Sequence, residues 1–336
     1  MEKVMKAVTF TQGDGVKVQY VPQPQKAEPG FLLIKMEACA INPGDIAFMG
    51  RAFAATAVPQ SRYDIWGVSG VGTVIEVGDG VPPEYVGKNV TVYRSLQFND
   101  KVVGTWCQYA HLNYRQCAIL PNDIDMQDYA GTLVNTITPY AFLKQITAEG
   151  HKGIISTAGT SATGIAMLGI CLAYNFPLIS IVRTEEGKQQ LEELGAQHVA
   201  VESSPEFKQQ LKSMAEELQA TAVFDGVGGG ILNNIVDVLP NNTTVYCYGY
   251  LGGKTPLTIH TSAFMRGITI KGFGNFRSET VQNPEKLDEA LADISNILHM
   301  PHFKTKVGKG FTLDEINEAL AFSSTGGGKA VLYPFG

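Results

Sequence analysis

The segment ISTAGTSATGIA, residues 155–166, constrains the fold of this chain more than any other. It predicts a buried strand over residues 153–156, a tight turn of small residues, and then a helix. Gly159, Ser161 and Gly164 stand at the three positions of the G-x-G-x-x-G fingerprint, with serine in the middle. Such a turn lets the backbone approach a pyrophosphate, but small residues can also serve only to pack a helix on a strand. The motif alone leaves both interpretations open.

The residues that follow favour a dinucleotide site. A second apolar strand over residues 177–182 completes a strand–helix–strand unit of the length that a right-handed crossover needs. We therefore expect the nucleotide at the strand ends, with these candidate cofactor-binding residues in the first turn: Gly159, Thr160, Ser161, Ala162, Thr163 and Gly164.

Arg183 follows the second strand, where an NAD site places an acid that holds the ribose 2′-hydroxyl. A guanidinium is always charged and pairs with the 2′-phosphate of NADP(H), so the sequence favours that cofactor. Lys188 could add a second positive charge, although both side chains could also be ordinary surface cations. The glutamates at 185–186 suit the first turn of a helix capped by Thr184, and we do not interpret them as the missing acid.

Length and charge limit the class of protein. A chain of 336 residues exceeds the usual size of a single hydrophobic core, so two domains are expected. The net charge of -6 argues against a nucleic-acid partner, which needs a basic face. We see no membrane span and no signal peptide, and we expect a cytoplasmic protein with its five cysteines reduced.

Two regions differ in their pattern. Residues 1–126 contain short alternating runs separated by glycine and proline, which indicates a β-rich domain. From residue 127 to residue 272 strands and helices alternate, which predicts an α/β domain with a parallel sheet. The expected strands of that sheet are residues 153–156, 177–182, 198–201, 222–225, 243–248 and 268–271.

Motifs along the whole chain carry a family resemblance. They include AINPGDIAFMG, GVSGVGTVIEVGDG, GTWCQYAHL, FDGVGGG, VYCYGYLGG, ITIKGFGNF and GGGKAVL. In this order they resemble the medium-chain dehydrogenase/reductase superfamily, in its zinc-independent quinone oxidoreductase and enoyl reductase branch. The resemblance implies a GroES-like catalytic domain in residues 1–126, a doubly wound Rossmann NADP-binding domain in residues 127–272, and a return of residues 273–336 to the first domain.

The positions that hold catalytic zinc in other members of the superfamily carry different residues here. Asn42 stands in the place of the first cysteine, Val68 in that of the histidine, and Ser69 in that of the following acid. The lobe for structural zinc is also missing, because residues 92–104 contain no cysteine. We therefore expect no metal, and reduction of an already polarised double bond by NADPH is the chemistry that such a site can still perform.

The resemblance assigns roles to several residues. It places Asn42 near the nicotinamide ribose and the substrate, and Thr138 near the nicotinamide amide. The turn after a Rossmann strand brings Tyr248, Gly249 and Tyr250 beside the nicotinamide, although each tyrosine could instead line the core. The candidate catalytic residues are Asn42, Tyr63 and Tyr250, and the further cofactor-binding candidates are Gly228 and Phe273.

Three functions remain open. Quinone or enone reduction ranks first. Enoyl thioester reduction ranks second, because members of that branch use a tyrosine eight residues after the aspartate that aligns with Asp45, and this chain has Phe53 there, with Tyr63 as a substitute. The third is a protein that binds NADP without turnover, as a sensor or structural protein.

Two further expectations concern substrate and assembly. The segment over residues 51–60 is expected to cover a small-molecule site, with mostly small apolar side chains. The last Rossmann strand, residues 268–271, should be a sheet edge, and the apolar run over residues 257–264 could help cover it across a two-fold axis. A homodimer is therefore expected.

Overall fold

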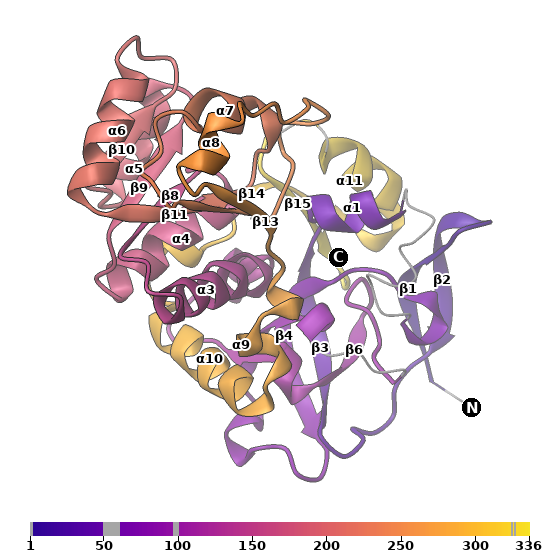
Figure 1. Ribbon diagram of the computed structural model, residues 1–336. Coiled ribbons are helices and arrows are strands. Elements are labelled where there is room, and N and C mark those ends of the chain that lie inside the picture. Colours follow the sequence, from indigo (N-terminus) through magenta and orange to yellow (C-terminus); the bar gives the residue numbers. More distant parts are fainter. Residues whose placement is uncertain (1–2, 50–60, 97–100, 324, 326) are drawn as a thin grey trace. The chain divides into compact units, whose positions relative to one another are not determined.

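The computed structural model describes residues 3–49, 61–96, 101–323, 325 and 327–336 (Figure 1). The chain forms two compact units. The first, called the β-rich unit, comprises residues 1–134, 287–299 and 304–336. The second, called the α/β unit, comprises residues 135–286 and 300–303.

The β-rich unit is built on a sheet in the order β14-β15-β3-β4-β5-β7, with β6 pairing to β3, and on a separate antiparallel pair of β1 and β2. The strands are β1 Val4–Thr11, β2 Gly15–Pro22, β3 Phe31–Ala40, β4 Ser69–Val77, β5 Asn89–Tyr93, β6 Tyr109–Asn113, β7 Cys117–Ile119, β14 Val307–Thr312 and β15 Lys329–Tyr333. The helices with most of their residues here are α1 Pro43–Met49, α10 Pro284–Ile297 and α11 Ile316–Ser323.

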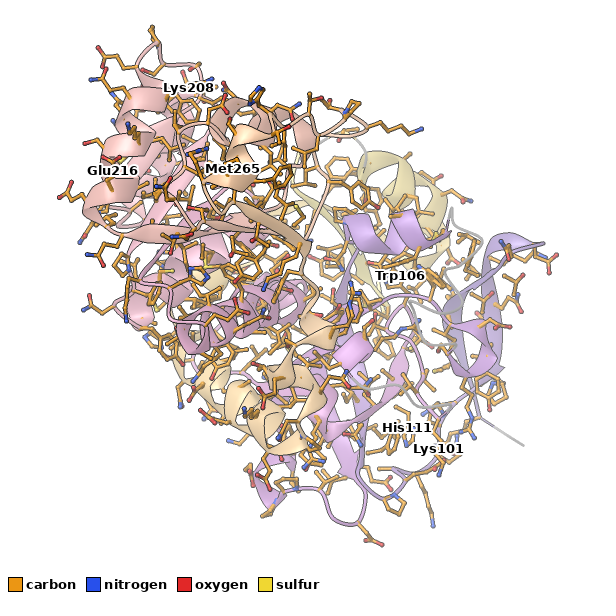
Figure 2. The ribbon with its side chains drawn as sticks, viewed as in Figure 1. Lys101, Trp106, His111, Lys208, Glu216 and Met265 are labelled. Carbon is orange, nitrogen blue, oxygen red and sulfur yellow. The ribbon has the colours of Figure 1, made fainter. Side chains whose placement is uncertain are left out.

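The core of the β-rich unit forms around β3, whose residues are nearly all buried. Trp106, which is labelled in Figure 2, is fully buried in the same core. Each large apolar side chain buried in this way contributes roughly 1.5–3 kcal/mol relative to exposure. The strand β15 lies between β14 and β3, and Leu332 pairs with Cys39, so the residues of β15 come close to those that follow β3.

The α/β unit contains a parallel sheet in the order β10-β9-β8-β11-β12-β13. Its strands are β8 Gly153–Ser156, β9 Leu178–Val182, β10 His198–Val201, β11 Ala220–Asp225, β12 Thr244–Cys247 and β13 Thr269–Gly272. Its helices are α3 Thr132–Ala148, which begins in the β-rich unit, α4 Ala162–Ala173, α5 Glu185–Glu193, α6 Phe207–Glu217, α7 Gly229–Ile235, α8 Ser262–Met265 and α9 Glu279–Gln282. The predicted doubly wound parallel sheet is thereby confirmed, with the strand order that reverses between β8 and β11.

Helices cover both faces of this sheet. The apolar side chains of α6 and α7 form one core with β9, β11 and β12. On the other face, the ring of Phe142 in α3 packs against Phe224 at 4.5 Å and Tyr246 at 5.0 Å between centroids. Lys208 and Glu216 mark the exposed side of α6 in Figure 2, and Met265 of α8 is 86% exposed.

The division into domains at residues 1–126, 127–272 and 273–336 remains our proposal for where the domains end. Among the described residues, no helix is both long and apolar enough to cross a membrane.

Candidate functional site

The turn after β8 has the geometry that a close approach of the backbone requires. Ala158 adopts a left-handed conformation with φ 53°, and the N–H of Gly159 donates to the Ile181 carbonyl at 2.9 Å. The Ser161 hydroxyl accepts a hydrogen bond from the N–H of Gly164 at 3.1 Å and caps α4. The serine in the middle of the fingerprint is therefore the N-cap of the helix.

Glycine is required where the turn meets the helix. A Cβ atom added at Gly164 would lie 2.4 Å from the Ala158 carbonyl oxygen, which no side chain tolerates.

The backbone N–H groups of Ala162 and Thr163 donate to no group among the described residues. Thr160 and Ala162 are exposed. The start of this 12-residue helix thus presents unpaired donors at its positive dipole end.

The loops after β11 and β12 lie against the same turn. The buried Asp225 carboxylate accepts from the Thr157 hydroxyl at 2.7 Å and from the N–H of Gly228 at 3.0 Å. Burial raises the pKa of Asp225, and the hydrogen bonds from Thr157 and the backbone oppose that rise. The backbone donor of Gly228, a predicted cofactor ligand, is therefore used inside the protein, and Gly228 has φ 95°.

Tyr248 carries an unpaired polar atom. Its ring stacks on Phe224 with 3.9 Å between centroids, and its buried hydroxyl has no hydrogen-bond partner in the described structure. Burial raises the pKa of this hydroxyl, and Ser161 is near enough to oppose the rise. At Gly249 a Cβ atom would lie 2.9 Å from the Gly226 carbonyl oxygen, while Tyr250 is 54% exposed.

The positive groups expected near a ribose phosphate lie after β9. Arg183 is exposed and has no ion-pair partner among the described residues. Thr184 caps α5 by accepting from the N–H of Gly187 at 3.3 Å, as the sequence predicts. Lys188 lies one turn from Glu192, with 3.9 Å between the charged atoms, so its charge is partly compensated.

Two other candidates lie on the α3 face of the sheet. The Thr138 hydroxyl accepts a hydrogen bond from the Asn275 amide at 2.8 Å. Phe273 is largely buried, with its ring centroid 5.4 Å from that of Phe142. The backbone N–H of Phe273 donates to the Cys247 carbonyl at 2.8 Å and is therefore used inside the protein.

The β-rich unit holds a polar cluster that we call the Asn42 cluster: Asn42, Asp45, Ser69 and Lys329. The buried Asn42 amide donates to Asp45 at 3.0 Å and to Ser69 at 2.8 Å. Its oxygen accepts from the Lys329 ammonium at 2.6 Å. Both amide hydrogens of Asn42 are thus used within the cluster, and only its oxygen keeps a free lone pair.

Burial perturbs both ionisable members of the Asn42 cluster. Burial raises the pKa of Asp45 to about 6, although the hydrogen bonds from Asn42 and the charges of Arg94 and Lys329 lower it. Burial lowers the pKa of Lys329 to about 8, and the Asp45 charge limits the fall. Near pH 7 the pair therefore exists mainly as carboxylate and ammonium.

The donor set here does not suit zinc. Val68 offers no lone pair, and the oxygen of Asn42 already accepts from a cation. Among the described residues, no three histidine, cysteine or acidic side chains come together as a metal site. A divalent metal at Asn42 would also face the Lys329 charge, and that the purified protein is metal-free remains our prediction.

Tyr63 lies in a strained segment. It has φ 62°, is followed by Asp64 with φ 54°, and is 41% exposed. Left-handed backbone in bulky residues is costly and often accompanies function. Phe53 and the segment 51–60 lie outside the described residues.

The geometry of the α/β unit, taken alone, is suited to binding a dinucleotide. The unpaired donors of Ala162 and Thr163, the partnerless Tyr248 hydroxyl and the glycine turn all lie at the carboxyl ends of β8, β11 and β12. This is the side of the sheet, at the reversal of strand order, where open α/β sheets bind ligands.

Sequence reasoning missed three features of the site. It did not anticipate the left-handed backbone of Ala158, the hydrogen bond from the Gly228 N–H to Asp225, or the presence of Lys329 beside Asn42. For Lys329 the available signal is the glycine run before it in GGGKAVL, which the sequence analysis used only as a family motif.

Comparison with known proteins supports the same family. Residues 28–138 match the alcohol dehydrogenase GroES-like domain, and residues 162–293 match the zinc-binding dehydrogenase family. The mitochondrial enoyl-[acyl-carrier-protein] reductase of Bos taurus is 26% identical over 85% of this chain and 76% of its own length. The quinone oxidoreductase of Lama guanicoe is 23% identical over 98% of both chains.

A solved structure agrees on the fold. A mutant form of the enoyl thioester reductase from Candida tropicalis has a TM-score of 0.78 over 98% of this chain and 100% of its own, at 23% identity. The β-rich unit is therefore GroES-like and the α/β unit Rossmann-like. The chain belongs to the medium-chain dehydrogenase/reductase superfamily, in its zinc-independent quinone oxidoreductase and enoyl reductase branch.

Proposed function

We propose that this protein is an NADPH-dependent oxidoreductase that reduces quinones or α,β-unsaturated carbonyl compounds without a metal. Membership of the superfamily supports an oxidoreductase that uses a nicotinamide cofactor. The observation that carries the substrate class is the Asn42 cluster, in which an amide and a hydroxyl stand at metal-ligand positions beside the Lys329 ammonium. Hydrogen-bond donors suffice to stabilise charge on a carbonyl oxygen when the double bond is already polarised.

The α/β unit supplies the cofactor site in this proposal. The N–H groups of Ala162 and Thr163 would hold the pyrophosphate, and the Tyr248 hydroxyl would donate to the cofactor. Arg183 would pair with the 2′-phosphate, which favours NADPH over NADH. Gly159, Thr160, Ser161, Gly164, Lys188, Gly228, Gly249, Phe273 and Thr138 complete the proposed cofactor-contacting set.

The reduction balances without further reagents. When bound, NADPH supplies a hydride from C4 of its nicotinamide. The substrate β-carbon gains that hydrogen, the electrons of the double bond move to the carbonyl oxygen, and a proton from a hydroxyl, an ammonium or water completes the product. Asn42, Tyr63 and Tyr250 are the proposed polar groups around the substrate.

Enoyl thioester reduction is the second candidate. Support comes from the mitochondrial enoyl reductases among the relatives, of which the Bos taurus protein is an example. The strained Tyr63 would then serve as the donor that Phe53 cannot be. A non-catalytic NADP-binding protein is a third candidate of another class.

One assay separates these three functions. NADPH oxidation is followed with a small quinone, a linear enone, a crotonyl thioester, and ethanol with NADP⁺. Turnover of the quinone or enone supports the first function. Preference for the thioester, abolished in Tyr63→Phe, supports the second, and NADPH binding without turnover of any compound supports the third. Oxidation of ethanol would contradict the proposal.

A homodimer in the cytoplasm is also proposed. The strand β13 lies at the edge of its sheet and is mostly exposed, and Phe264 and Met265 beside it are 57% and 86% exposed. A second copy would cover this edge and its apolar neighbours. Light scattering should give about twice the monomer mass of 36.3 kDa at micromolar concentration, and a monomer would contradict this.

A further inference from the structure

Lys329 is a cation with spare donors. Its ammonium has three N–H bonds, and one of them binds the Asn42 oxygen at 2.6 Å. No other side chain among the described residues hydrogen-bonds to it or lies within ion-pair distance. Lys329 as a whole residue is partly exposed, whereas Asn42, Asp45 and Ser69 are buried. Lys329 is therefore the least buried residue of the Asn42 cluster.

The fold makes room for this lysine. A Cβ atom added at Gly131 would lie 3.0 Å from Cε and 3.1 Å from Cδ of Lys329, so glycine there leaves space for the stem. Gly328, which precedes the lysine, has φ 110°, a conformation that other residues rarely adopt. The backbone N–H of Lys329 is fixed to the Lys306 carbonyl at 2.9 Å.

Keeping a half-buried cation without a direct anionic partner is costly. Asp45 is the carboxylate that influences it, yet one Asp45 oxygen takes the Asn42 donors and the other has no partner at all. A purely structural cluster would be expected to satisfy these groups. The unused N–H donors of Lys329 and the unpaired oxygen of Asp45 therefore point to a ligand that pairs with the cluster.

We propose that Lys329 is a catalytic residue, whose ammonium donates a hydrogen bond to the substrate carbonyl oxygen while negative charge develops there. The inference rests on the proposed reductase function. It adds a positive charge to a site in which the two Asn42 hydrogens are already used. Asn42 then acts as a positioning residue, because its oxygen holds the ammonium in place.

The step balances in charge and atoms. The substrate gains hydride at its β-carbon, and the carbonyl oxygen becomes an enolate oxygen that accepts the Lys329 hydrogen bond. A proton from water, or from Lys329 with later replacement from water, is then added at the α-carbon. Removal of one well-placed donor to a developing oxyanion costs roughly 100 to 1,000-fold in rate.

The first test compares kinetics of Lys329→Met and Lys329→Arg with the wild type, using the quinone and the enone. Lys329→Met should lower kcat about 100-fold or more, while the dissociation constant for NADPH changes less than about threefold. Lys329→Arg should recover part of kcat, because the cation remains. Gly131→Ala, which crowds the stem without removing the charge, should give an intermediate loss. Lys309→Met, an exposed lysine of β14, is the matched control and should keep full activity.

The pH dependence offers a readout that a structural role would not move. Asp45 of α1 and Arg94, in the turn after β5, are the charged groups that influence the cluster. Because the ammonium loses its proton near pH 8, wild-type kcat should fall as pH rises through about 8. Lys329→Met should lack this alkaline limb. A kcat in Lys329→Met within threefold of the wild type, with the same pH profile, overturns the inference.

A binding experiment separates the inference from the proposed function. 4-Nitrophenol mimics an enolate oxygen, and its absorbance reports ionisation. In the presence of NADP⁺ the wild type should bind the phenolate and lower the apparent pKa of the probe, and Lys329→Met, shown to be folded by its thermal unfolding curve, should not. Phenolate binding lost in Lys329→Met, without reduction of any test compound, sustains the oxyanion site and contradicts the reductase. Equal phenolate binding by both proteins overturns the inference whether or not reduction occurs.

Discussion

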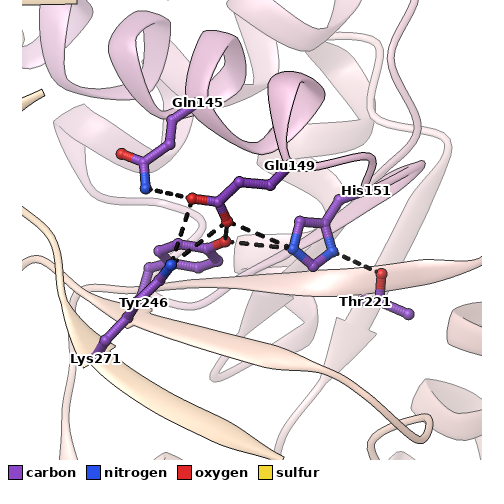
Figure 3. A network of polar contacts seen from close by, with 6 residues as sticks. All are labelled: Gln145, Glu149, His151, Thr221, Tyr246 and Lys271. Carbon is purple, nitrogen blue, oxygen red and sulfur yellow. Dashed lines mark hydrogen bonds and ion pairs between the residues drawn. The ribbon is translucent and has the colours of Figure 1, made fainter. Parts of the chain in front are cut away.

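Two polar clusters, one in each unit, differ in whether their charged groups are paired. We call the second the Glu149 cluster: Gln145, Glu149, His151, Thr221, Tyr246 and Lys271 (Figure 3). In it Glu149 accepts from Gln145 at 2.8 Å, from Lys271 at 3.3 Å and from the Tyr246 hydroxyl. His151 contacts the Thr221 hydroxyl at 2.8 Å. The Asn42 cluster instead contains a lysine with spare donors and a partnerless carboxylate oxygen.

The difference separates a structural network from a candidate site. The Glu149 cluster ties the residue that follows α3 to β11, β12 and β13, and its polar groups satisfy one another. The Lys271 ammonium also lies 4.6 Å from the centroid of the Tyr246 ring, so its charge has a second, cation–π partner. Pairing of this kind fixes a fold, whereas unpaired groups at Lys329 and Arg183 are available to ligands.

Breaking the paired cluster should give the largest loss of stability. Glu149→Ala leaves Tyr246 and Lys271 without their shared acceptor, and we expect about 3 kcal/mol of destabilisation with kcat nearly unchanged. Urea unfolding measures the first effect and steady-state kinetics the second. Gln210→Ala, at an exposed position of α6, is the control. A large loss of kcat in correctly folded Glu149→Ala would erase the contrast between the clusters.

Removing the unpaired arginine should change cofactor choice and little else. Arg183→Ala should reduce the NADPH to NADH affinity ratio about 10 to 100-fold, the size of one charge-assisted bidentate contact, because an exposed side chain without partners adds little to stability. Fluorescence titration with both cofactors measures the ratio, and Lys208→Ala on α6 is the control. A wild type that binds both cofactors equally, or an unchanged ratio, would remove Arg183 from the site.

Neutralising Asp45 should shift the pH dependence of kcat, which sharpens the contrast between the Asn42 cluster and the Glu149 cluster. The Asp45 charge raises the pKa of Lys329, so Asp45→Asn should shift the alkaline fall in kcat from about pH 8 to lower pH. A shift of about one pH unit would lower kcat about threefold at pH 7.5, since less of the ammonium is charged. A pH–rate profile that stays in place in Asp45→Asn would show that the alkaline limb does not report Lys329.

The smallest effect is expected at His151. Burial lowers its pKa below the ordinary value of 6.5, so the unfolded chain takes up this proton first and stability falls as pH decreases below about 6.5. His151→Asn should remove this part of the acid sensitivity and cost less than about 1 kcal/mol at pH 7.5. Thermal unfolding at pH 5.5 and 7.5 measures it, and an unchanged pH dependence would show that folding does not lower the pKa of His151.

Local patterns predicted the α/β unit well. The spacing of Gly159, Ser161 and Gly164, the apolar runs and the cap at Thr184 act over a few residues, and the turn, strands and α5 form where those patterns predict them. The left-handed Ala158 was not predictable, because alanine has no preference for that conformation and the surrounding hydrogen bonds impose it.

Contacts distant in sequence were beyond such patterns. Lys329 lies 287 residues from Asn42, and only the insertion of β15 between β14 and β3 brings them together. The sequence identified Asn42 through its family position but gave no sign that both amide hydrogens are used internally. The roles assigned to Asn42, Tyr63 and Tyr250 therefore stay predictions for the assays above.

The position of β15 has a consequence for synthesis. Residues 329–333 leave the ribosome about 290 residues after β3, which corresponds to on the order of 15 to 60 seconds at bacterial and eukaryotic elongation rates. Throughout that interval Cys39 and Ala40 lack their β15 partners, and the Asn42 oxygen lacks its lysine. The Rossmann-like unit can fold during this time, because its strands are complete earlier. The Asn42 cluster is thus among the last parts of the molecule to form on a nascent chain.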